Sequence, residues 1–111
     1  MQISEQRQGA VTVLKPQGPL VGADAEQFKN EVTQAMERSL GRLVVDASAV
    51  PFCDSRGLEV MVEVSEALAE SGQSFRLCGA PEVIREVLEI TDLAHHFEHY
   101  QDVQTAVRSF L

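Results

Sequence analysis

The sequence has few cationic residues and no long apolar run. Nine Lys and Arg stand against seventeen Asp and Glu among 111 residues, so the formal net charge is −8. Nucleic-acid binding draws most of its affinity from clustered cations, and we therefore expect no nucleic-acid partner. No segment approaches the roughly 20 apolar residues that cross a bilayer, and residues 1–5 do not start like a secretion signal. We expect a cytoplasmic protein that does not insert into membranes.

Cysteines and phosphate-binding motifs are also scarce. The two cysteines, Cys53 and Cys78, form no CxxC arrangement and stand in or beside apolar runs, which predicts buried free thiols in a reducing compartment. Neither GxxxxGK[ST] nor GxGxxG occurs, so we expect no self-contained nucleotide enzyme and no cofactor. Cys53 has no neighbouring His, and the spacing of Asp46 and Asp54 does not favour acid–base catalysis over turns and caps, so we expect no catalytic residues. His95, His96 and His99 are close in the chain, but adjacent residues point to different sides. We expect a solvated loop there and no metal site.

Strand-like and helix-like segments alternate along the chain. Strands are expected at 2–7, 10–16, 43–45, 74–78 and 97–100. Helices are expected at 24–38, where Asp24 and Gln27 form a capping-box pattern, and at 55–71. A third helix is expected to begin with Pro81 as its first residue, and its apolar stripe consists of Val83, Ile84, Val87 and Leu88. A fourth, short helix is expected after Asp102, which caps it. The order β-β-α-β-α-β-α-β-α predicts one α/β domain over 1–111. Its mixed sheet of about five strands opens with an antiparallel hairpin, continues in parallel, and carries about four helices at its faces.

The segment 43–58 is the most informative part of the chain, because an apolar strand leads through a short loop into a helix. The first amide groups of a helix lack intrahelical partners and attract negative charge. A phosphate on Ser55 would be stable there, which makes Ser55 a candidate phosphoacceptor. The simpler interpretation is that Asp54 or Ser55 caps the helix.

The helix expected at 55–71 has an apolar side and an acidic side. The apolar side carries Leu58, Met61, Val64, Leu68 and Ala69, and the acidic side carries Glu59, Glu63, Glu66 and Glu70. The acidic stripe is either a solvated face that keeps the protein in solution or a docking surface for a basic partner. Arg56, three residues before Glu59, is expected to neutralise in part the charge at the N-terminal end of the acidic stripe.

These residues resemble the STAS domains, named for sulfate transporters and bacterial anti-sigma factor antagonists. The resemblance covers essentially the whole chain and is carried by Val44-Val45-Asp46 followed by residues 50–58, by Gly18-Pro19-Leu20, and by residues 97–107. It implies a small binding module that docks on an anti-sigma factor with serine-kinase activity and frees a sigma factor. The alternatives are an accessory subunit of a membrane transporter, with the transporter ATPase as partner, and a scaffold in a signalling complex.

The chain departs from this family at one position. In phosphorylated members the acceptor Ser or Thr immediately precedes the glycine, and its phosphate blocks docking. Here Arg56 occupies that position. Three interpretations follow: a kinase with shifted register modifies Ser55, the module binds constitutively with Arg56 as a permanent positive contact, or the partner differs altogether. We favour the last two.

The sequence thus predicts a partner-binding surface on the 51–57 loop and the start of the second helix. Its expected members are Asp54, Ser55, Arg56, Gly57, Glu59 and Glu63. Self-association is a further expectation that the exposed edges of the opening hairpin would allow.

Overall fold

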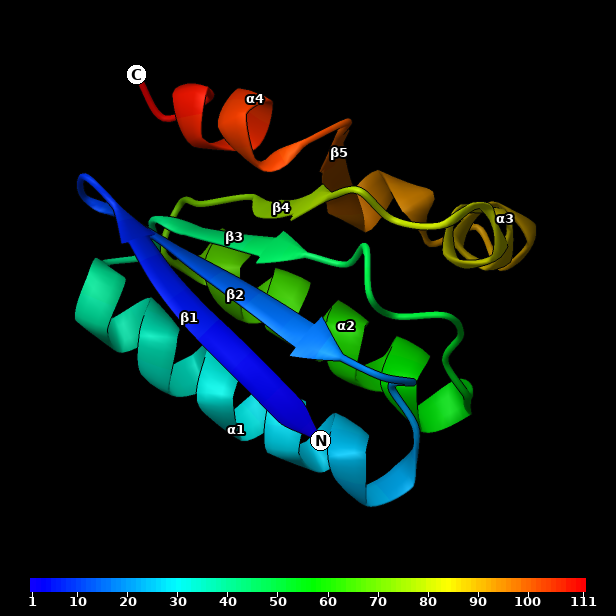
Figure 1. Cartoon of the computed structure of the whole chain (residues 1–111). Coiled ribbons are helices and arrows are strands. Elements are labelled where there is room, and N and C mark those ends of the chain that lie inside the picture. The colour runs from blue at the N-terminus through cyan, green and yellow to red at the C-terminus, as the bar shows by residue number, and fades with distance from the viewer.

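A computed structural model describes all residues 1–111, and its five strands form one mixed sheet in the order β1-β2-β3-β4-β5 (Figure 1). The strands are β1 (Gln2–Gln8), β2 (Val11–Gln17), β3 (Leu43–Asp46), β4 (Phe75–Cys78) and β5 (Phe97–Tyr100). The β1 and β2 strands form an antiparallel hairpin, and every later neighbour is parallel. The expected fold class is confirmed.

Four α-helices connect or follow these strands: α1 (Gly22–Ser39), α2 (Ser55–Glu70), α3 (Glu82–Ile90) and α4 (Val103–Arg108). The α1 and α2 helices lie side by side against one face of the sheet, and α4 covers the other face (Figure 1). None of the helices has the length and apolar character that a membrane crossing requires.

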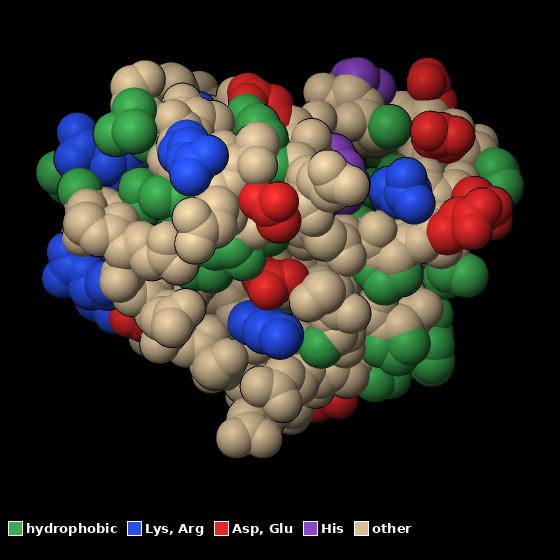
Figure 2. Space-filling view, turned by 45° about the horizontal axis from the view of Figure 1, so that its top comes forward, with side chains coloured by type: hydrophobic (Ala, Val, Ile, Leu, Met, Phe, Trp, Pro, Cys, Tyr) green, Lys and Arg blue, Asp and Glu red, His purple; other side chains and the backbone are tan.

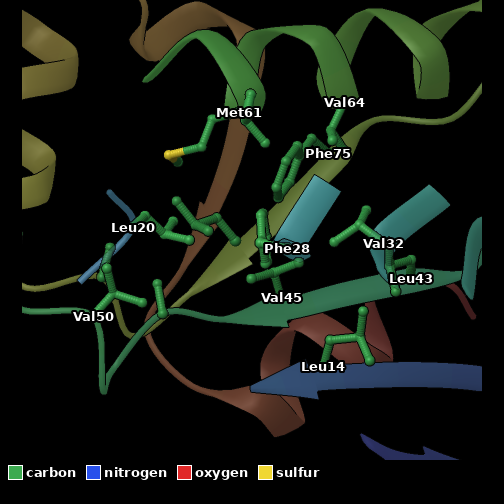
Figure 3. Close-up of a cluster of buried hydrophobic side chains, with 14 of the residues drawn as sticks. Leu14, Leu20, Phe28, Val32, Leu43, Val45, Val50, Met61, Val64 and Phe75 are labelled. Atoms are coloured by element: carbon green, nitrogen blue, oxygen red, sulfur yellow. The ribbon is translucent and has the colours of Figure 1, made fainter. Parts of the chain in front are cut away.

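The main core lies between the sheet and the α1–α2 layer. Phe28 and Val32 of α1 meet Met61 and Val64 of α2 above Val45 of β3 (Figure 3). A smaller core on the other face joins Val11, Val13, Val44, Cys78 and Ala106. Because consecutive residues of a strand face opposite sides, β3 contributes an apolar side chain to each core. The apolar run at 43–45 therefore marks a strand that is covered on both faces.

The expected capping box of the first helix is wrong. Helix α1 begins at Gly22, and the residue at its N-cap position, Val21, has no side-chain hydrogen bond. Asp24 lies inside the first turn and accepts a hydrogen bond from the amino group of Met1 at 3.0 Å. The amide of Gly22 donates instead to Asp54, 32 positions further along the chain. Local spacing does not reveal a cap that comes from another loop.

Two further details differ from the sequence prediction. Pro81 is the N-cap of α3 and not its first residue, and Val83, expected on the apolar stripe, is 48% exposed. In α2, Val60 is buried and Ala69 is exposed, so the buried side is turned about the helix axis, away from Ala69 and toward Val60. Helix α1 packs beside α2, and Val60 belongs to the main core together with Phe28 and Val32 of α1.

Candidate functional site

The loops that lead into α1 and α2 run side by side and bring the two helix N-termini together. Leu20 and Cys53 form a parallel β-bridge. The amide of Leu20 donates to the Phe52 carbonyl at 3.1 Å, and the amide of Asp54 donates to the Leu20 carbonyl at 3.2 Å. These backbone contacts hold the 51–57 loop against the loop before α1, at the end of the sheet where β2 and β3 finish.

Asp54 caps both helices at this junction. Its Oδ1 atom accepts a hydrogen bond from the Gly57 amide at 2.8 Å, and its Oδ2 atom accepts one from the Gly22 amide at 3.1 Å. The hydrogen bond from Gly57, assisted by the one from Gly22, holds the pKa of Asp54 below its ordinary value. The carboxylate thus lies where two partly positive helix ends meet. The simpler interpretation of Asp54 as a helix cap is correct, and its role extends to a second helix.

Gly57 is required by packing. A Cβ atom added at Gly57 would lie 2.2 Å from the Leu20 carbonyl oxygen and 3.0 Å from the Cys53 Cβ atom. Any larger residue would push the two loops apart, because protein interiors are packed without spare volume. Gly57 is buried, so its part in the expected surface is to set the position of the loop.

Ser55 is the first residue of α2 and is exposed. Because Asp54 provides the cap, the hydroxyl group of Ser55 is not needed for that purpose. It lies at the N-terminal end of a 16-residue helix, where negative charge is stabilised.

Arg56 is held by three carboxylates of this chain. Its guanidinium group donates to Glu26 of α1 through Nε, and through Nη1 to Glu59 at 3.2 Å and Glu63 at 2.7 Å. The hydrogen bonds to Glu26 and then Glu63 raise the pKa of Arg56 above its ordinary value. The side chain is 31% exposed. The expected partial neutralisation of the N-terminal end of the acidic stripe by Arg56 is confirmed. A carboxylate of a partner would have to compete with Glu26, Glu59 and Glu63 for Arg56.

Lys29 of α1 completes this ion cluster. Its Nζ atom donates to Glu63 at 2.6 Å. That hydrogen bond, together with the one from Arg56, lowers the pKa of Glu63. Two cations therefore face three carboxylates, and the cluster has an excess of negative charge.

Sequence reasoning missed Glu26 and Lys29. The spacing of Arg56, Glu59 and Glu63 is visible within one helix, since residues three and seven apart share a face. Glu26 and Lys29 are about 30 positions away and become neighbours only because α1 packs beside α2. Their places in α1 carry no signal of this pairing.

The remaining candidates lie elsewhere. The rings of His95 and His96 stack with centroids 4.4 Å apart, whereas His99 accepts a hydrogen bond from the Ala80 amide at 3.3 Å. The pKa of His99 is lowered, mainly by burial. Cys78 is buried, as expected, and burial raises its pKa to about 12, while Cys53 is only half-buried.

Comparison of this chain with known protein families gives its class. A family model described as the STAS domain matches residues 2–106, so the chain belongs to the STAS domain family. The resemblance inferred from the sequence motifs is confirmed. BtrV, a candidate anti-sigma factor antagonist of Bordetella bronchiseptica, is 28% identical to this chain over 94 residues, which cover 85% of this chain and 81% of BtrV.

Solved structures show the same fold. The crystal structure of a candidate anti-sigma factor antagonist from Thermotoga maritima has a TM-score of 0.87 at 24% identity, over 96% of this chain and 92% of that one. An anti-sigma-factor antagonist (STAS) domain protein from Planctomyces limnophilus has a TM-score of 0.82 at 24% identity, over 96% of both chains. These structures and this chain therefore share one fold.

Proposed function

We propose that this protein regulates transcription by binding an anti-sigma factor with serine-kinase activity. The binding surface is the 51–57 loop and the first turns of α2, with Asp54, Ser55, Arg56, Glu59 and Glu63 as its polar groups and Gly57 beneath them. The observation that carries the proposal is the exposed Ser55 beside the partly exposed Arg56, on a loop that two helix N-termini hold rigidly. The relatives named as anti-sigma factor antagonists support the choice of partner.

We further propose that docking does not depend on a phosphate at the position before Gly57. Arg56 occupies that position, and its guanidinium group stays charged at any working pH. Because Arg56 is held among Glu26, Glu59 and Glu63, it orders the acidic groups that a partner meets. The binding output of the module is then constitutive, and modification of Ser55 is the alternative.

A binding experiment tests the surface. The protein is used to capture its partner from native lysate, the partner is identified and purified, and dissociation constants are measured by calorimetry. We expect Arg56→Glu to weaken binding about tenfold or more, because it removes the cation that orders the cluster. Ser55→Asp should also weaken binding without unfolding the domain, since Asp is a good residue at helix starts.

The matched control is Arg42→Glu, which makes the same charge change at an exposed residue. Arg42 immediately precedes β3, whereas the 51–57 loop follows the other end of that strand. Equal affinity of the wild type and of both loop variants would refute the proposed surface. The identity of the captured protein separates an anti-sigma factor from a transporter ATPase or a signalling complex. Mass measurement after incubation with a captured kinase and ATP tests the constitutive mode, and a phosphate on Ser55 would overturn it.

A further inference from the structure

An apolar groove lies beside the acidic stripe of α2. It has a volume of about 370 Å³ and is lined by Leu58 and Val62 of α2 and by Leu93, with Glu59 and Glu63 at its rim. Leu58 and Leu93 pack with their inner sides against the main core and are only partly buried. The floor of the groove is thus supported by the core, while its mouth is open to solvent.

Glu59 and Glu63 at the rim are paired with Arg56 and Lys29, which leaves this ion cluster with an excess of negative charge, and further carboxylates lie on α2 and α3. Glu66 of α2 and Glu82, Glu86 and Glu89 of α3 are exposed and form no ion pair. Ile90, 83% exposed, lies three residues before Leu93 at the end of α3. Figure 2 shows acidic and hydrophobic side chains close together on the side of the molecule that α3 occupies, with a Lys or Arg side chain among them. A partner for this side needs apolar and cationic groups next to each other.

We propose that the groove binds an amphipathic helix of the partner, one that inserts a large aliphatic side chain between Leu58, Val62 and Leu93 and places Lys or Arg against the acidic rim. This inference rests on the proposed function, because the groove begins at Leu58, two residues after Arg56. A second copy of this chain does not fit as the occupant. The chain carries a net charge of −8, and the rims of two copies would repel each other.

The two parts of the groove contribute differently. Burial of an aliphatic anchor strengthens binding about tenfold or more, because apolar surface leaves water. The carboxylates of the rim mainly accelerate the encounter with a cationic segment, and salt screens this effect. Affinity should therefore fall moderately with ionic strength and sharply when the groove is made polar.

Two peptides of identical composition test this chemistry directly. Each contains about 14 Leu and Lys residues, roughly four helical turns. One arrangement gives a continuous Leu face, and the other distributes Leu around the helix. In a titration followed by amide resonances of the ¹⁵N-labelled protein, we expect the first peptide to bind about tenfold more tightly and to shift the resonances of Leu58, Val62 and Leu93. Equal binding of both peptides, or shifts that avoid these residues, would overturn the proposal.

Variants with the purified natural partner separate this inference from the proposed function. Val62→Lys introduces a cation into the groove, and Leu93→Gln makes it polar with a smaller change of shape. Circular dichroism shows whether each variant is folded. We expect both to weaken binding about tenfold. If Arg56→Glu weakens binding and the groove variants do not, the groove has no part in docking and the proposed function stands. If none of the three weakens binding, the proposed surface fails as well.

Discussion

Gly57→Ala should destabilise this protein, although alanine is the better helix former. Gly57 lies in the first turn of α2, where helix propensity alone would make the alanine variant more stable by up to about 1 kcal/mol. The structure predicts the opposite sign. An added Cβ atom would lie 2.2 Å from the Leu20 carbonyl oxygen, which belongs to the loop before α1.

The size of the effect follows from this contact. Aliphatic carbon and carbonyl oxygen are ordinarily about 3.3–3.6 Å apart, so the loops must separate by about 1 Å. Overpacking of this kind costs about 1–3 kcal/mol. The same carbonyl accepts the backbone hydrogen bond from Asp54 at 3.2 Å, and such a bond contributes about 1 kcal/mol. After subtraction of the gain in helix propensity, we expect a net loss of about 1–3 kcal/mol in the free energy of unfolding.

Urea unfolding followed by far-ultraviolet circular dichroism measures this difference. Ala67→Gly provides the matched control, because Ala67 is exposed in the same helix and only propensity acts there. The control should lose up to about 1 kcal/mol. If Gly57→Ala proved as stable as the wild type, or more stable, the steric argument for Gly57 would be refuted.

Three further predictions concern the core, the loss of stability at acidic pH, and the reactivity of the two thiols. Phe28 is 0% exposed, and Phe28→Ala should lower the free energy of unfolding by about 3–5 kcal/mol in the same urea assay. Phe52 is 50% exposed, and Phe52→Ala should lower it far less. Similar losses in the two variants would contradict the position of Phe28 in the core. Because the pKa of Asp54 is lowered in the folded state, its stabilising effect is complete above its ordinary pKa of 3.8 and is lost as the pH falls through the folded value. Stability measured against pH should thus fall less steeply below about pH 4 in Asp54→Asn, and an unchanged slope would argue against the double cap. A thiol reagent at neutral pH should modify Cys53 and leave Cys78 unreacted until denaturant is added, since Cys78 is fully buried with a pKa of about 12; two reactive thiols in the native protein would contradict this.

The order of elements could be predicted from the chain because each signal is local. The apolar run at 43–45, the hairpin around Gly9 and the cap at Asp102 depend on residues a few positions apart. Backbone conformation and the alternation of apolar and polar residues respond to such neighbours directly. The family resemblance likewise rested on short segments, namely residues 18–20, 44–46, 50–58 and 97–107.

The same local origin explains the errors. The expected cap at Asp24 failed because the true partner of the α1 N-terminus, Asp54, comes from a different loop. The buried side of α2 was predicted with Ala69 and without Val60, because the packing of α1 beside α2 belongs to the tertiary structure and not to the spacing within one helix.

The amino-acid sequence by itself determined the strand and helix pattern, the excess of negative charge, and the position of Ser55 at the start of a helix. Only the tertiary structure decided what Arg56 does. A guanidinium group binds whatever carboxylates the fold brings within reach, and here the packing of α1 on α2 brings Glu26 to it from 30 positions away. Pairing over such distances depends on how two faces meet, and no single segment of the chain contains that information.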